Sequence, residues 1–168
     1  MMPVLLKGDR LVVSKYPYGW SWVSPSFHIL PPTEGRLLGS MPERGDIVIV
    51  TPPGQRADYI KRVIGLPGDE LEMIDGQLII NGTPLKRVER PPASFPIDEN
   101  LPCFPDEYGD QRMTGPDGQP YCRLPVVRET LPNGRSYETV ELGRSQTDNF
   151  GPIRIPDKHL WLMGDNRD

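Results

Sequence analysis

The residue with the most suggestive chemical setting is Lys61, which lies in a largely apolar segment at residues 58–65. Side chains alternate along a β-strand, so Lys61 would share one face with Tyr59 and Val63. Burial of a lysine ammonium favours the neutral amine, and a neutral amine can take a proton from a nucleophile. A lysine in a strand is more often exposed at a solvated edge. The rest of the sequence decides between these two interpretations.

Turn signals flank the strand that would hold Lys61. Residues 66–69 read Leu-Pro-Gly-Asp, in which proline presets the first turn dihedral and glycine supplies the positive φ of a type II turn. Residues 43–50 read Glu-Arg-Gly-Asp followed by Ile-Val-Ile-Val, which predicts a turn leading into a second strand. That turn, and not an adhesion motif, explains the Arg-Gly-Asp triplet.

Four segments, at residues 1–9, 43–50, 58–69 and 163–168, resemble in this order the sequence boxes of the type I signal peptidases, the bacterial membrane-bound leader peptidases. The resemblance extends from the first residue to the last. Its most specific parts are the Lys61 segment at residues 58–69 and the closing run at residues 164–168. It implies a serine endopeptidase that removes N-terminal signal peptides from exported proteins after an Ala-x-Ala-like site. It also implies a bacterial inner-membrane protein whose catalytic part faces the periplasm.

The same resemblance assigns roles to individual residues by their position in the boxes. Lys61 matches the general base of a Ser–Lys pair, which can do the work of a Ser–His pair when the lysine is desolvated. Arg62 and Asp165, beside Gly164, are expected to pair across the sheet and to hold the two ends of the catalytic unit together. The small pockets for the Ala-x-Ala end are expected to be lined by Met1, Leu5, Tyr59, Ile60, Leu162 and Met163.

The nucleophile of the family is expected outside this chain. In the family the catalytic serine directly precedes the Met-x-Pro that here begins at Met1, and a serine that helps to orient the lysine follows the last box. We therefore expect a chain truncated at both ends, which by itself does not cleave leader peptides. Ser40 precedes Met41 and Pro42, but no residue separates that methionine from the proline, and the segment predicts a turn.

Two other functions are compatible with the sequence. A self-cleaving repressor-type protease also uses a Ser–Lys pair, but it would need a DNA-binding N-terminal region and a small-residue cleavage site within the chain, and neither is evident. A non-catalytic peptide-binding β module would share the fold and have no nucleophile. The residue encoded directly before Met1 distinguishes these functions from the peptidase.

Composition narrows the possible partners. The net charge is −4 and the 19 Lys and Arg residues are spread along the chain, so we expect no nucleic-acid partner. The spacing of cysteines and histidines does not suit a metal site, and we expect neither a metal nor a cofactor. Cys103 and Cys122 instead suggest a disulfide formed in an oxidising compartment, with two free thiols as the alternative. No apolar stretch approaches the ~20 residues of a membrane span.

Short alternating segments separated by turn signals predict an all-β protein. The 21 Pro and 17 Gly residues favour short strands over long helices. The dipeptides at residues 75–76, 81–82 and 133–134 are Asp-Gly or Asn-Gly, which predict hairpins. A further strand is expected at residues 10–15.

The resemblance implies a signal-peptidase-like fold, with an antiparallel catalytic β unit made from both chain ends and a second β unit inserted between them. We place the catalytic unit at residues 1–70 and 152–168 and the inserted unit at 71–151, with an irregular loop at about 87–119. An aromatic, proline-rich hairpin at about 16–38 is expected either to contact the membrane surface or to pack on its own domain. The resemblance also implies a membrane-spanning segment before residue 1, which would be a second contact with the membrane.

Overall fold

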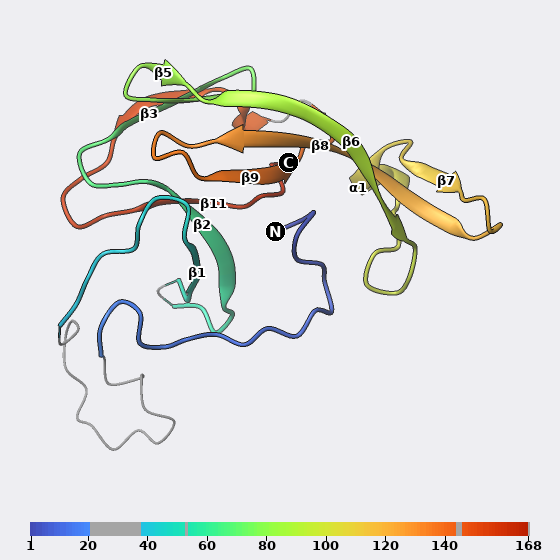
Figure 1. The fold of residues 1–168 in the computed structure, drawn as a ribbon, viewed down its shortest axis with the longest axis horizontal. Helices are drawn as coiled ribbons and strands as arrows, with labels where there is room; N and C mark the ends of the chain where they lie inside the picture. The colour runs from blue at the N-terminus through green and yellow to red at the C-terminus, as the bar shows by residue number, and fades with distance from the viewer. Residues whose placement is uncertain (21–37, 53, 144–145, 168) are drawn as a thin grey trace. The chain divides into compact units, whose positions relative to one another are not determined.

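A computed structural model shows the fold and describes residues 1–20, 38–52, 54–143 and 146–167. The chain divides into two compact units, one made of residues 1–9 with 44–168 and the other of residues 10–43. The larger unit is built almost entirely from strands, which confirms the predicted all-β class (Figure 1). Its regular elements, in chain order, are β1 (Ile47–Val50), β2 (Tyr59–Gly65), β3 (Glu70–Ile74), β4 (Gln77–Ile80), β5 (Thr83–Pro84), β6 (Lys86–Pro96), α1 (Pro105–Tyr108), β7 (Arg112–Thr114), β8 (Pro120–Thr130), β9 (Ser136–Val140), η1 (Gln146–Asp148), β10 (Phe150–Arg154) and β11 (Trp161–Met163).

The first sheet contains Lys61 on its central strand. Its order is β1-β2-β11, and both pairings are antiparallel. β1 precedes β2 in the chain, whereas β11 comes from the opposite end, so the sheet is a β unit made from distant parts of the sequence. Val63 and Ile64 of β2 point to opposite faces and are both fully buried, which shows that this end of the strand is covered on both sides.

The second sheet has the order β10-β3-β4-β5 and depends on two tight turns. Asp75 and Gly76 have φ values of 47° and 76°, and Asn81 and Gly82 have φ values of 52° and 74°. Two successive positive φ values are typical of the type I′ turn, whose twist matches that of the strands on either side. The predicted hairpins are therefore present, and local turn chemistry sets the register of this sheet.

The third sheet contains the longest strands, β6 and β8, with β7 and β9 also paired to β8 (Figure 1). It corrects the irregular loop predicted at about residues 87–119, because the first part of that range is strand β6 and a later part is β7. The prediction failed at Pro91 and Pro92, since proline has no backbone N–H and argues against a central strand. Both are tolerated because β6 is an edge strand whose register shifts between Arg90 and Ala93.

Two apolar clusters form the core of the larger unit. The first draws on β2, β3, β4 and β9, so it packs all three sheets against one another. Its buried members are Ile64, Leu71, Met73, Leu78, Ile80, Leu85, Leu131, Tyr137 and Ile155. The second cluster surrounds the disulfide and contains Leu101, Cys103, Tyr108, Cys122, Leu124 and Val140.

The smaller unit departs from one sequence expectation. Its described residues form no β-strand, so the strand predicted at residues 10–15 is wrong. Leu11, Val12 and Val13 are exposed there. An apolar run forms a strand only when a neighbouring strand accepts its backbone groups, and residues 10–15 pair with no strand of the described chain.

The aromatic segment predicted at about residues 16–38 falls mostly outside the described residues, and so do Trp22 and Phe27. Within the described part, the rings of Tyr16 and Trp20 have centroids 4.5 Å apart. In the portion of the chain that the structure describes, no helix has the length and apolar character needed to cross a bilayer.

Candidate functional site

Lys61 lies near the middle of β2, with strands on both sides. Its direct partner on β1 is Val48, and on the other side Leu162 of β11 is paired with Val63. Directly paired residues of antiparallel strands point to the same face of the sheet. Lys61 is therefore flanked on its own face by aliphatic side chains from two neighbouring strands, and it is half-buried.

Gly164, directly after β11, lies against the Lys61 amine. A Cβ added at Gly164 would be 3.6 Å from Lys61 Nζ and 3.2 Å from the carbonyl oxygen of Asn166. The amine is thus next to the backbone of the segment that follows β11. Any side chain larger than hydrogen at this position would narrow the space around Nζ.

The guanidinium of Arg62, on the opposite face of β2, is fully engaged. Arg62 Nε and Nη2 donate to Asp165 Oδ1 and Oδ2 at 2.8 and 2.7 Å. Nη1 donates to the carbonyl oxygen of Gly45 at 2.9 Å. Asp165 is 1% exposed, so this bidentate pair is buried. The structure therefore brings Arg62 and Asp165 together, and Asp165 is held by the guanidinium and not by Lys61.

The backbone nitrogen of Met1 shares this electrostatic environment. This nitrogen lies within range of the charges of Asp165, Lys61 and Arg62. Interactions between charges weaken with distance. The chain therefore enters the larger unit beside β2, and Figure 1 shows the N-terminus at this place.

The residues predicted to line the substrate pockets come from three segments of the larger unit. Among them only Tyr59 is exposed, and the others are half-buried. The predicted set is Met1 and Leu5 from the N-terminal segment, Tyr59 and Ile60 from β2, and Leu162 and Met163 from β11.

The strand residues of this set do not all face the same way. Tyr59 and Leu162 lie on the face of β2 that carries Lys61. Ile60 and Met163 lie on the other face, where Met163 packs against the first core cluster. The sequence predicted the residue types near Lys61, but the pairing register divides them between two surfaces.

The turn after β2 is fixed by the carboxylate of Asp69. Its Oδ2 accepts hydrogen bonds from Leu66 N at 2.6 Å and Arg44 Nη2 at 2.8 Å, and its Oδ1 accepts one from Asn81 Nδ2 at 2.8 Å. Burial raises the pKa of Asp69, but the hydrogen bonds from Leu66, Asn81 and Arg44 outweigh it and hold the pKa below its ordinary value. This ionised group joins the end of β2 to the turn before β1 and to the next sheet.

Comparison with known proteins gives the family. A family model described as signal peptidase, peptidase S26, matches residues 1–168. The chain belongs to this family. Signal peptidase I of Rickettsia typhi is 35% identical over 177 residues, which cover 100% of this chain and 58% of that protein. The signal peptidases I of Rickettsia canadensis and Rickettsia felis match with the same identity and coverage. The chain thus spans just over half the length of these relatives.

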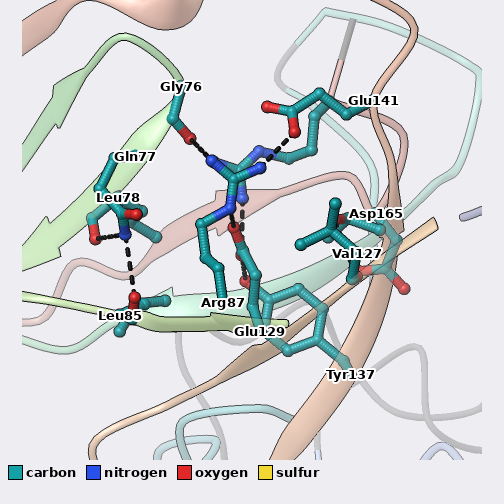
Figure 2. A network of polar contacts seen from close by, with 12 residues as sticks. Gly76, Gln77, Leu78, Leu85, Arg87, Val127, Glu129, Tyr137, Glu141 and Asp165 are labelled. Atoms are coloured by element: carbon teal, nitrogen blue, oxygen red, sulfur yellow. Dashed lines mark hydrogen bonds and ion pairs between the residues drawn. The ribbon is translucent and has the colours of Figure 1, made fainter. Parts of the chain in front are cut away.

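In this signal peptidase chain a further polar group, which the sequence did not predict, adjoins the Arg62–Asp165 pair. The guanidinium carbon of Arg62 lies 4.7 Å from the centroid of the Tyr137 ring, a cation–π contact. The Tyr137 hydroxyl donates to Glu129 Oε2 at 2.6 Å, and Figure 2 shows Glu129 between Tyr137 and Arg87. Burial, the Glu129 charge and this hydrogen bond raise the pKa of Tyr137, so its hydroxyl stays a donor.

Strand register explains why this group was missed. Arg87, Glu129 and Tyr137 are direct partners across β6, β8 and β9. The proline-interrupted β6 was expected to be a loop, so the sequence gave no reason to place Arg87 opposite Glu129. The available signal was an acidic residue within the strand-like residues 126–130, which needs a cationic partner if it faces the core.

Other chemically interesting features lie apart from Lys61. Cys103 and Cys122 form a disulfide with an S–S distance of 2.05 Å. Among the described residues, no group of three or more His, Cys, Asp or Glu side chains could hold a metal ion. A pocket of about 380 Å³ contains none of the predicted site residues and is lined by Pro92, Asp110, Gln111, Arg112, Met113, Arg123 and Pro125.

Proposed function

We propose that this chain is the catalytic part of a signal peptidase that removes leader peptides from exported proteins after an Ala-x-Ala-like end. The observation that carries the proposal is the half-buried Lys61 of β2, which has aliphatic side chains on its own face while Asp165 is bound by Arg62 on the other. In the family's first box the nucleophilic serine directly precedes the position of Met1. We place that serine on the Met1 nitrogen, which lies within range of the Lys61 charge.

The contacts of the two neighbouring cations support different roles for them. Arg62 takes both oxygens of Asp165. For Lys61, no hydrogen bond or ion pair to another described residue is recorded, so its amine is available to a substrate or a nucleophile. A carboxylate bound to a lysine favours the charged ammonium, which cannot accept a proton. A lysine that acts as a base therefore needs the nearby carboxylate to be bound elsewhere, and here Arg62 binds Asp165.

The proposed reaction proceeds through an acyl-enzyme. The serine oxygen attacks the carbonyl carbon of the scissile bond while the Lys61 amine takes the hydroxyl proton. The tetrahedral intermediate collapses, the C–N bond breaks, and the Lys61 ammonium gives its proton to the leaving amine. Water then attacks the acyl ester with Lys61 again as the base, which releases the leader peptide as a carboxylic acid and restores the serine.

We assign the selection of small residues to the apolar side chains around Lys61. Shallow pockets exclude large substrate side chains by steric clash, which is a common source of specificity. On the face of Lys61, Tyr59 and Leu162 are suitably placed, and Val48 joins them although the sequence did not single it out. Met1 and Leu5 complete the proposed set, and Ile60 and Met163 are left out of it because they lie on the other face of β2.

We further propose a periplasmic setting at the bacterial inner membrane. The Cys103–Cys122 disulfide supports an oxidising compartment. Tyr16 and Trp20, which contact each other in the smaller unit, are side chains that favour the membrane interface. The proposed partners are signal peptides of preproteins and the membrane surface, and we propose no role for nucleic acid, metal or cofactor.

The decisive experiment uses the full-length protein and a synthetic peptide with an Ala-x-Ala end. Lys61→Ala and Lys61→Arg should each remove nearly all cleavage while the fold is kept, because a guanidinium stays protonated. Lys86→Ala, an exposed lysine at the start of β6, is the matched control and should cleave like wild type. Substantial activity in Lys61→Arg would show that Lys61 is not the base.

A second experiment tests the position of the nucleophile. Residues 1–168 alone should not cleave the same peptide, because the proposed serine precedes Met1. Ser40 is exposed and its hydroxyl donates to the Pro17 carbonyl oxygen at 3.4 Å. Cleavage by residues 1–168 that is lost in Ser40→Ala would make Ser40 the nucleophile, and cleavage that survives this change would place the nucleophile elsewhere.

A further inference from the structure

The carboxylate of Glu129 is buried, with 1% of the residue exposed, and the reaction proposed above does not use it. It accepts hydrogen bonds at Oε2 from the Tyr137 hydroxyl at 2.6 Å and from Arg167 Nη1 at 2.9 Å. Its Oε1 lies 3.6 Å from Arg87 Nε. Three partners from three different parts of the chain thus meet at one carboxylate, and Figure 2 labels two of them, Arg87 and Tyr137, beside Glu129.

Two of these partners lead to the residues around Lys61. Tyr137 presents its ring to Arg62, the neighbour of Lys61 on β2. Arg167 belongs to the segment that begins with Gly164, which lies against the Lys61 amine. Glu129 is therefore linked to both elements that frame Nζ without touching the amine itself.

Backbone contacts tie the same segment to β9. Val140 N donates to the Asp165 carbonyl oxygen at 3.0 Å, and Arg167 N donates to the Val140 carbonyl oxygen at 3.1 Å. These two bonds hold the backbone of residues 165–167 at Val140, and the Asp165 side chain is held separately by Arg62. The Arg167 side chain supplies a third attachment through Glu129, at the end of the segment that Arg62 does not hold.

The energetics favour a role in orientation over one in stability. Burying charges is costly, and well-packed apolar residues in their place are often as stable. Charged hydrogen bonds, in contrast, specify distance and angle. Without Glu129, the Arg167 side chain, which is 6% exposed, would keep only a contact to Met73 Sδ at 3.7 Å among its recorded partners.

We propose that Glu129 is a positioning residue for the proposed reaction: through Arg167 and Tyr137 it fixes the Gly164–Arg167 segment and Arg62, and thereby the place of the Lys61 amine. This inference rests on the proposed function of Lys61. The β8–β9 hairpin of the third sheet would then help to set the geometry of the first sheet, which contains Lys61.

The test is Glu129→Gln in the full-length protein, which keeps the shape and removes the charge. With the Ala-x-Ala peptide, kcat should fall by about 10-fold, since small displacements of a reacting group are expensive in rate. KM should stay within about 2-fold, because substrate contacts are untouched. The matched control is Glu138→Gln on the same hairpin, where Glu138 pairs with Arg128 at the surface, and it should behave like wild type.

A double-mutant cycle separates positioning through Arg167 from a general weakening of the fold. If Glu129 acts through Arg167, then Glu129→Gln and Arg167→Gln together should lose about as much kcat as the worse single variant. Losses that multiply, or a higher KM with unchanged kcat, would overturn the proposal. So would a Glu129→Gln enzyme that matches the Glu138→Gln control.

A milder variant covers the case in which Glu129→Gln does not fold. Tyr137→Phe removes only the hydroxyl that donates to Glu129 and keeps the ring beside Arg62; it should lower kcat by about 3-fold at unchanged KM. Unchanged kcat in Tyr137→Phe would then overturn the proposal. Lys61→Arg is measured in parallel: its activity would overturn the proposed function itself, whereas an inactive Lys61→Arg with an unaffected Glu129→Gln overturns only the positioning role.

Discussion

The surroundings of Lys61 and those of the Cys103–Cys122 disulfide are built by different means. Near Lys61, segments far apart in the sequence are joined by a buried bidentate pair, Arg62 with Asp165. Near the disulfide, a covalent bond lies within an apolar cluster. A disulfide chiefly restricts the unfolded chain, whereas a bidentate ion pair fixes distance and angle in the folded one. Directional contacts are thus found where the proposed chemistry needs accurate placement.

The largest effect is expected from breaking the ion pair. Asp165→Ala leaves the Arg62 guanidinium buried without its carboxylate and should lower the free energy of unfolding by about 3–5 kcal/mol. Chemical denaturation of both proteins measures the difference. Asp117→Ala, which removes an exposed carboxylate bound to Tyr121, is the control and should change stability by less than about 1 kcal/mol. Equal losses in the two variants would mean that the Arg62–Asp165 pair has no special weight.

Removing the disulfide should affect stability and spare the rate. Replacing Cys103 and Cys122 together by serine should cost about 3 kcal/mol, the order expected for closing a loop of this size. Well below the melting temperature, the kcat for peptide cleavage should stay near wild type, because the covalent bond belongs to the other region. A large fall in kcat in the folded variant would show that the disulfide also affects the placement of the groups around Lys61.

A smaller effect, confined to the rate, is expected at Gly164. The added methyl group of Gly164→Ala would touch Lys61 Nζ at 3.6 Å and press on the Asn166 carbonyl oxygen at 3.2 Å, so the segment beside the amine must shift and kcat should fall by about 10-fold. Gly143→Ala is the control, since no atom lies within 4 Å of the Cβ it would add. A wild-type kcat in Gly164→Ala would contradict the placement of the reacting Lys61 amine beside Gly164.

The smallest effect concerns the pH dependence of stability. The pKa of Asp69 is lower in the folded protein than in the unfolded chain, so its contribution is fully present above its ordinary pKa of about 3.9 and is lost as pH falls through the folded value. The stability difference between wild type and Asp69→Asn should therefore be constant near neutral pH and shrink below about pH 4. A difference that grows on acidification would contradict the assigned hydrogen bonds.

Local signals account for the parts of the fold that could be predicted. The hairpin at Asp75-Gly76 depends on two adjacent residues, and the opposite directions of Lys61 and Arg62 follow from strand alternation alone. Both are decided by residues next to each other in the chain. The β class and the Lys61 strand could therefore be predicted from the sequence.

The parts that could not be predicted depend on register between distant strands. Val48 lies opposite Lys61, and Arg87 lies opposite Glu129, only because of how long loops close. The same register places Met163, like Ile60, on the face of the first sheet opposite to Lys61. Pairing over such separations is set by the shared core, and no pattern within one segment carries it.

The prolines of β6 have a consequence for the behaviour of the molecule in crowded conditions. An edge strand of this length normally offers a row of free N–H and C=O groups on which a second chain can polymerise. Pro91, Pro92 and Pro96 leave β6 with fewer backbone N–H donors than its length would give, and the register shift after Arg90 bends the strand. The same residues that concealed β6 in the sequence make the outer border of the longest sheet a poor template for aggregation.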